Sequence, residues 1–279
     1  MDDCTIQTPE QATITLNTLL QNHYHTPPFT ESQQQVNNYL ETPFTTDELA
    51  LVKQAIDYGA DVNSAVFKPY LWPFENKPAQ FTLLSYAICF GHHDLARLLI
   101  AAGADVNDSS STTFKKRPIH FCNDSTLFGE LLAANTLVNY QDNDGNTQLN
   151  STIVSYIIFP STALQKNQCH MNWLILYGAD PMIKNKRGIS AFDYADHVAR
   201  RDPDVGKKLI SMLNGTHPEY TQFLRTIAKD HLPAAQAIRD RQIYGPWHDT
   251  RHAARTYARY KMHALPASSS TESSAPAEE

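Results

Sequence analysis

The chain of 279 residues has no long run of apolar residues. Its longest mostly apolar stretch, Ile153–Phe159, is interrupted by Ser155 and stopped by Pro160, whereas a membrane-spanning helix needs about 20 apolar residues. The acidic start, residues 1–4, lacks the basic and apolar segments of a secretory signal peptide. We therefore expect a soluble protein, and the apolar fraction of 42% is sufficient for a buried core.

Cysteine and glycine are both scarce. The four cysteines form no C-x-x-C pair, which argues against a disulfide framework or a cysteine-rich zinc site and is typical of a reducing compartment. None of the ten glycines belongs to a phosphate-binding loop of the G-x-x-x-x-G-K-[ST] or G-x-G-x-x-G kind. The motif H-E-x-x-H is absent, and His217-Pro218-Glu219 lacks the P-C-x-x-C of zinc deaminases. We predict no metal and no cofactor.

Charge is unevenly distributed along the chain. The net charge is −6, yet residues 1–52 contain seven acidic residues and no Lys or Arg, whereas residues 184–261 sum to +7. Such asymmetry predicts charged interaction surfaces without identifying what binds to them.

A repeated pentapeptide is the strongest signal in the sequence. Gly59-Ala60-Asp61-Val62-Asn63 recurs as residues 103–107, and Gly-Ala-Asp returns at residues 178–180. Each copy follows an apolar helical stretch. We therefore predict a helix that closes at a glycine in the left-handed conformation, followed by a turn that suits Asp and Asn.

The other half of the repeating unit begins at Thr82-Leu83-Leu84-Ser85-Tyr86-Ala87 and passes through Gly91-His92. Residues 117–122, 147–152 and 190–195 take the same place in later units. These segments resemble the T-P-L-H-x-A start, central G-H and closing G-A-D-V-N of the ankyrin repeat. The resemblance extends from Thr45 to Leu213. It implies an all-α solenoid of helix–turn–helix repeats with short β-hairpin fingers, whose usual activity is protein binding.

Several units depart from the regular spacing. From Asn63 to Thr82 is 19 residues, where regular units take 8, so an insertion is expected near 64–81. A second insertion is expected near 153–170, between the helices of the fourth unit, and insertions in solenoids often map to loops on the binding face. The third unit is short, and Asn135 stands where its closing glycine is expected.

These boundaries divide the chain into four parts. Residues 1–44 are expected to form an N-terminal helical cap, with helices at 10–24 and 31–40, and Thr45 with Glu48 fits a capping box. Residues 45–213 hold about five degenerate repeats. Residues 214–265 form a basic segment with helices at 218–229, 234–244 and 249–263. The composition of 266–279 predicts a disordered tail.

Three groups of residues are candidates for partner binding. The first is the aromatic part of the long finger, Phe67, Tyr70, Trp72 and Phe74, because aromatic side chains dominate protein–protein hot spots. These side chains could instead fold back onto the repeat core.

The second group follows from the ankyrin resemblance, which implies contacts through the fingertips: Phe114, Lys115, Lys116, Asn143, Lys184, Lys186 and Arg187. The third group is Arg251, Arg255 and Arg259, which are expected to share one face of the helix predicted at 249–263 and to suit an acidic partner, a membrane surface or a nucleic acid. An ordinary solvated surface is the alternative for the second and third groups.

Catalysis has weak support. His120 lies near Cys122, and Cys169 adjoins His170, but a thiol enzyme needs a Cys–His pair with an orienting third group. We expect structural roles for all four residues.

The sequence therefore predicts an adaptor that binds another protein. The degenerate repeats, the Asn- and Gln-rich start and the Ser/Thr/Glu tail also resemble ankyrin effectors that intracellular bacteria export through Dot/Icm-type IV secretion systems into the host cytoplasm. A eukaryotic scaffold protein and an enzyme with a small catalytic module outside the repeats are the alternatives.

Overall fold

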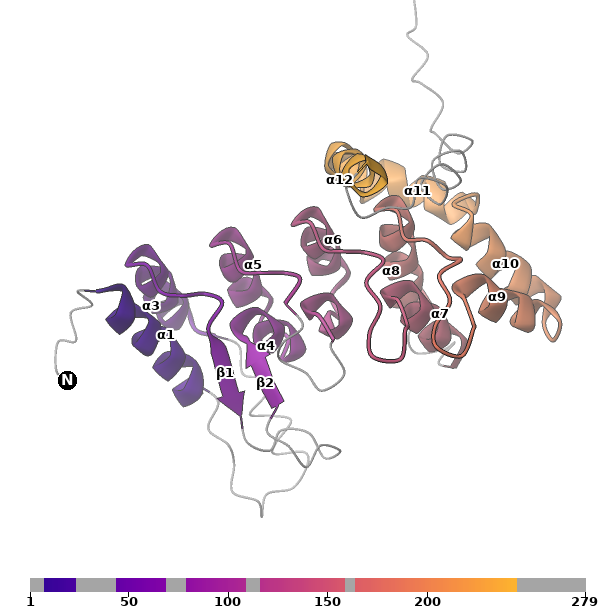
Figure 1. The fold of residues 1–279 in the computed structure, drawn as a ribbon. Helices are drawn as coiled ribbons and strands as arrows, with labels where there is room; N and C mark the ends of the chain where they lie inside the picture. Colours follow the sequence, from indigo (N-terminus) through magenta and orange to yellow (C-terminus); the bar gives the residue numbers. More distant parts are fainter. Residues whose placement is uncertain (1–7, 24–43, 69–78, 109–115, 159–163, 245–279) are drawn as a thin grey trace, which may run out of the picture.

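The computed structural model describes residues 8–23, 44–68, 79–108, 116–158 and 164–244, and the structural statements that follow concern these residues. This part of the chain is mostly helical (Figure 1). Its α-helices are α1 (Pro9–His23), α3 (Thr46–Asp57), α4 (Leu83–Cys89), α5 (His93–Ala101), α6 (Ser125–Ala133), α7 (Gln148–Ile158), α8 (Leu164–Leu176), α9 (Ala191–Ala199), α10 (Pro203–Leu213), α11 (Pro218–Thr226) and α12 (Leu232–Tyr244). Two strands, β1 (Ala65–Lys68) and β2 (Ala79–Thr82), and two 3₁₀ helices, η1 (Pro118–Phe121) and η2 (Lys229–His231), complete it.

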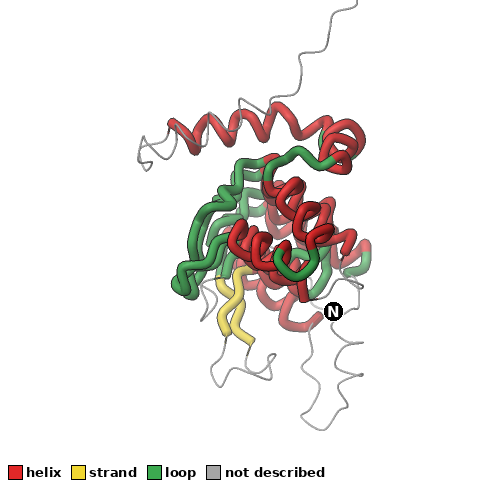
Figure 2. The backbone as a smooth tube through the Cα atoms, turned by 90° about the vertical axis from the view of Figure 1, so that its right-hand side faces the viewer, coloured by secondary structure: helices red, strands yellow, loops and turns green. Residues whose placement is uncertain are grey.

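The helices pair up, and the pairs stand side by side in a row (Figure 1). The pairs are α1 with α3, α4 with α5, α7 with α8, and α9 with α10, while η1 takes the place of a first helix before α6. In the turned view the connecting loops gather along one side of the helices (Figure 2). This arrangement is consistent with a helical repeat solenoid.

Each second helix of the row closes at a residue with positive φ. At the end of α5, Gly103 has φ +87°, its N–H donates to Ile100 O at 3.0 Å, and the N–H of Ala104 donates to Leu99 O at 3.0 Å. These bonds satisfy the last carbonyls of the helix. The closures predicted at glycines are confirmed. Asn135, with φ 72°, is the single residue other than glycine with positive φ in the described part of the chain.

Hydroxyl and carboxylate side chains fix where helices begin. Thr45 and Glu48 form the expected capping box before α3, and Thr82 Oγ1 accepts a hydrogen bond from Ser85 N at the start of α4. At the start of α9, Ser190 Oγ accepts a hydrogen bond from Asp193 N and donates one to Asp193 Oδ2. Each cap satisfies backbone N–H groups that have no partner inside the helix.

The first finger contains the strands. β1 and β2 pair in antiparallel register, with Ala65 opposite Thr82 and Lys68 opposite Ala79, so the two ends of the insertion expected near 64–81 lie side by side, and residues 69–78 lie outside the described residues. Short β-hairpins were expected in the other fingers as well, but residues 140–147 and 183–190 form turns instead. Each of these turns is closed by a bond such as Asp142 N to Asn146 O at 2.9 Å, which is too little for a ladder.

The third unit has a shortened first helix, and the fourth unit has two lengthened helices. The first helix of the third unit is reduced to η1, whereas α7 and α8 have 11 and 13 residues, against 7 and 9 in α4 and α5. The extra residues expected near 153–170 therefore lie in part within these two longer helices, and residues 159–163 between them lie outside the described residues. Ile153 and Tyr156 are buried on the lengthened α7, so their burial favours helix over loop.

The N-terminal helix packs as a member of the row. α1 contacts α3, and two side-chain bonds tie it to the turn after α3: Asp61 N donates to Thr13 Oγ1 at 2.8 Å, and Ser64 Oγ donates to Asn17 Oδ1 at 3.2 Å. α1 thus occupies the position of a first helix rather than covering a repeat that begins at Thr45. The helix expected at 31–40 lies outside the described residues.

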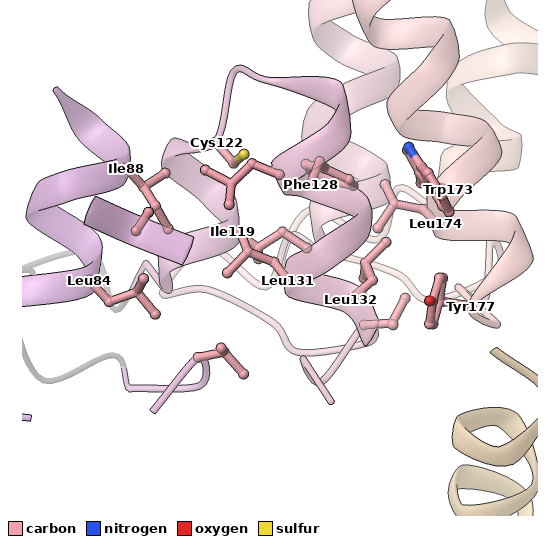
Figure 3. Close-up of a cluster of buried hydrophobic side chains, with 14 of the residues drawn as sticks. Leu84, Ile88, Ile119, Cys122, Phe128, Leu131, Leu132, Trp173, Leu174 and Tyr177 are labelled. Atoms are coloured by element: carbon pink, nitrogen blue, oxygen red, sulfur yellow. The ribbon is translucent and has the colours of Figure 1, made fainter. Parts of the chain in front are cut away.

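One continuous core runs through the row and into the C-terminal helices. Figure 3 shows its central part, which comes from α4, η1, α6 and α8. Trp173 of α8 meets Phe223 of α11 edge-on at 4.8 Å between ring centroids, and Tyr177 Oη lies 3.0 Å from His231 Nδ1. The described part of the C-terminal segment is therefore packed onto the repeats and is not a separate body.

We predict that Gly103→Val lowers the free energy of unfolding by about 1–3 kcal/mol, because a β-branched residue is strained at positive φ. Nothing lies within 4 Å of the position that a Cβ would take, so the cost comes from the backbone alone. Asn135→Gly is the matched control and should leave the stability unchanged or raise it by up to about 1 kcal/mol. Urea unfolding measures both, and an equal loss in the two variants would contradict the interpretation.

Candidate protein-interaction surface

At least two units of the row are linked to the closing turn of the next unit by an asparagine side chain. Asn107 Oδ1 accepts from Leu137 N at 2.8 Å, while its Nδ2 donates to Asn135 O at 3.0 Å. Asn139 repeats this arrangement with Asp180 N at 2.8 Å and Gly178 O at 3.2 Å. These bonds fix the distance between neighbouring fingers, because backbone groups of the next unit are held directly. Sequence reasoning assigned these asparagines to local turns and missed the link.

The fingertip after α8 is held together by one buried amide. Asn185 is 8% exposed, and its Oδ1 accepts from Arg187 N at 3.0 Å and from Ile189 N at 3.1 Å. Gly188 closes the turn at φ +75° and donates its N–H to Asn185 O at 2.9 Å. The backbone of residues 185–189 is therefore fixed before any partner arrives.

This fingertip is joined to the tip of the preceding finger. Lys186 N donates to Asp144 O at 3.0 Å, and Gln141 Nε2 donates to Lys184 O at 3.0 Å. Gly145 allows the approach, since a Cβ there would lie 2.8 Å from Lys186 N. The two tips form a single surface.

The predicted contact residues fall into three sets. Lys184, Lys186 and Arg187 are brought together, exposed, at the fixed tip, and Asn143 is exposed on the neighbouring tip. Lys116 is partly exposed at the base of an earlier finger. Phe67 lies in β1, and its side chain is outside the described part of the structure. The remaining candidates lie outside the described residues: Tyr70, Trp72, Phe74, Phe114, Lys115, Arg251, Arg255 and Arg259.

Arg117 is a further residue of this region that sequence reasoning missed. Its guanidinium carbon lies 3.6 Å from the centroid of the Tyr140 ring, and Nη1 donates to Asn107 Oδ1 at 2.9 Å. The side chain is 8% exposed, and burial lowers the pKa of the guanidinium from its usual value. The available signal was an arginine at a position where the other units have Thr or Ser, and a stacked cation stabilises the two fingers it joins.

The cysteine–histidine candidates for catalysis occupy packing positions. Burial raises the pKa of Cys122 to about 12 and lowers the pKa of His120 to about 4, so at neutral pH the thiol is protonated and the imidazole neutral. His170 stacks on Phe128 with 4.0 Å between ring centroids, and burial lowers its pKa to about 3. Burial also raises the pKa of Cys169. A nucleophilic thiol requires a lowered pKa, so these environments oppose that role.

The described ranges contain no group of three or more His, Cys, Asp or Glu side chains placed to hold a metal ion. They also contain no helix with the length and apolar character needed to cross a membrane.

Comparison with known proteins agrees with the helix pair α4–α5. Residues 80–111 match the family model of the ankyrin repeat. A search of curated proteins finds no match. The ankyrin repeat suggests a protein-interaction adaptor with a protein partner, and ankyrin repeats are typically non-catalytic binding modules.

We predict that the protein loses stability as the pH falls from 7 to 5. His170, 3% exposed, has a folded pKa of about 3, below the usual value of about 6.5, so the unfolded state binds a proton that the folded state excludes. The contribution of His170 to the free energy of unfolding is fully present above pH 6.5, and it falls by on the order of 1–2 kcal/mol by pH 5. Thermal unfolding of wild type and His170→Gln across this range measures it. A slope as steep in the variant as in the wild type would exclude His170 as the cause.

Proposed function

We propose that this protein is an ankyrin-repeat adaptor that binds another protein along its first helices and fingertips. The array extends from α1 to α10, so it begins at Pro9 instead of Thr45, and α11 and α12 cover part of its outer row. The match of residues 80–111 to the ankyrin-repeat model supports the repeat assignment. The observation that carries the function is the set of fingers fixed to one another by Asn107, Asn139 and Asn185.

Such an arrangement favours binding over catalysis for a physical reason. Loops usually have to be ordered when a partner docks, and that ordering reduces affinity. Here the backbone of the tips is ordered by internal hydrogen bonds in the free protein, so little ordering remains. Stacked repeats also give an extended surface to which several contacts contribute.

The experiment is affinity capture from a eukaryotic lysate with identification by mass spectrometry. Trp72→Ala combined with Phe74→Ala is expected to weaken capture of a protein that the wild type retains, with the melting temperature nearly unchanged, because aromatic anchors dominate hot spots. The control is Tyr58→Ala, which removes an exposed aromatic side chain at the end of α3. A large fall in melting temperature for the double variant would place the two side chains in the core. If the double variant captures the partner as well as the wild type does, the aromatic side chains of the long finger are not part of the interface.

We further propose that the partner is a host protein and that the adaptor is a bacterial effector exported by a type IV secretion system. The support is the composition of residues 266–279, outside the described residues, which combine small and hydroxyl side chains with Glu272, Glu278 and Glu279.

A translocation reporter fused to the N-terminus tests the export proposal. Deletion of residues 266–279 should abolish delivery into host cells while leaving folding and purified-protein binding intact, because the tail has no bulky apolar residue to contribute to the core. Undiminished delivery, or no delivery with the tail present, would overturn it.

A further inference from the structure

The fixed fingertip after α8 presents three cations within four residues. Lys184, Lys186 and Arg187 are all exposed. None of their side chains makes a hydrogen bond or ion pair with another residue of the described part of the chain. Positive charge is thus concentrated on one turn and is available to a partner.

Two carboxylates near this tip accept hydrogen bonds within the protein. Asp193 accepts from Ser190 N and Ser190 Oγ, both at 2.8 Å, and so serves the cap of α9. Asp142 accepts from the N–H groups of Asp144 and Asn146, both at 2.9 Å, within its own turn. Neither group forms an ion pair with the three cations in the described residues, although hydrogen bonds from Ser190 and, to a smaller extent, the charge of Lys184 lower the pKa of Asp193.

The tip is also rigid. Asn185 holds the turn from inside through bonds to residues 187 and 189, and its Nδ2 donates to Asn146 Oδ1 at 2.9 Å on the neighbouring tip. Lys186 N is bonded to Asp144 O across the same contact. Three cations on a fixed turn attract an anionic group without the entropy loss of first ordering the loop.

We propose that this tip, residues 184–187, is the docking point for an acidic segment of the partner protein. The inference rests on the proposed adaptor function and adds the chemistry of the partner at one place. Charge complementarity carries it, because an acidic segment near this tip is steered toward the surface and held in one register.

The neighbouring tip decides between an acidic protein segment and an extended polyanion. The tip that contacts residues 184–187 carries Asp142 and Asp144, so positive charge does not continue along the row there. A lipid surface or a nucleic acid duplex would bring its phosphates against these carboxylates, whereas a short acidic segment avoids them. The net charge of −6 acts in the same direction.

The test uses the full chain and a fluorescein-labelled decaglutamate peptide, with binding followed by fluorescence anisotropy. Lys186→Glu combined with Arg187→Glu should raise the dissociation constant on the order of tenfold. The matched control is Arg201→Glu combined with Lys207→Glu, which makes the same charge change with exposed residues beyond the far end of α9 and should have little effect. Raising the salt from about 50 to about 300 mM should weaken wild-type binding and narrow the difference between variants.

Asn185→Ala separates rigidity from charge. All three cations remain in this variant, but the turn loses the bonds that hold it, so an intermediate loss of affinity is expected. The thermal melts of all variants are compared, and the interpretation requires the tip variant to unfold like its control.

Three results would overturn the proposal: equal weakening by the tip and control variants, no weakening by the tip variant, or tip-dependent binding of phosphatidylserine vesicles or duplex DNA that is as tight as that of the peptide. If the wild type captures a partner from lysate but does not bind the peptide, the acidic segment is rejected and the adaptor function stands. If the wild type binds the peptide but captures no partner, the adaptor function is rejected and binding of an acidic segment at the tip stands.

Discussion

The amide side chain of an asparagine, held between two backbone groups of the next unit, is the interaction on which the arrangement of this protein depends. Asn107 and Asn139 each accept from one N–H and donate to one carbonyl of the following closing turn, about one repeat further along the chain. The positive-φ residue of that turn sets the shape of the turn. Because the asparagine bonds to this turn, the shape of the turn also sets the spacing between neighbouring units. Met182 stands at the corresponding position before the last turn of the row, and its side chain has no amide to repeat the link.

Irregular units are accommodated by changes in their neighbours. The short third unit leaves room beside α6, and the lengthened α8 fills it: Lys166 Nζ donates to Asn123 Oδ1 at 2.8 Å, and His170 stacks on Phe128. Gly129 allows the two helices to approach, since a Cβ there would lie 2.6 Å from the Trp173 ring. Because Trp173 also contacts Phe223, this same region anchors the C-terminal helices.

The candidate surface combines a rigid backbone with accessible charge. The buried amide of Asn185 orders the turn, while Lys184 before it and Lys186 and Arg187 after it remain exposed to solvent. Exposed ion pairs contribute little to folding because water screens them, so charges placed here cost the fold little and serve association instead. Fixing the turn with a neutral side chain leaves its cations free to meet a partner.

The sequence by itself determined the local conformations. The closing glycines, the substitution of Asn135 for one of them, the caps at Thr45 and Ser190 and most helices follow from residues within a few positions of one another. Tertiary structure decided what depends on residues far apart in the chain: that α1 joins the row, that the extra residues near 153–170 lengthen helices, and that α11 packs on α8 and α12 on α6. The stacking of Arg117 on Tyr140 and the contact between the two fingertips belong to the same class. Periodicity and capping act within one or two turns of a helix, whereas these contacts form only after the units have stacked.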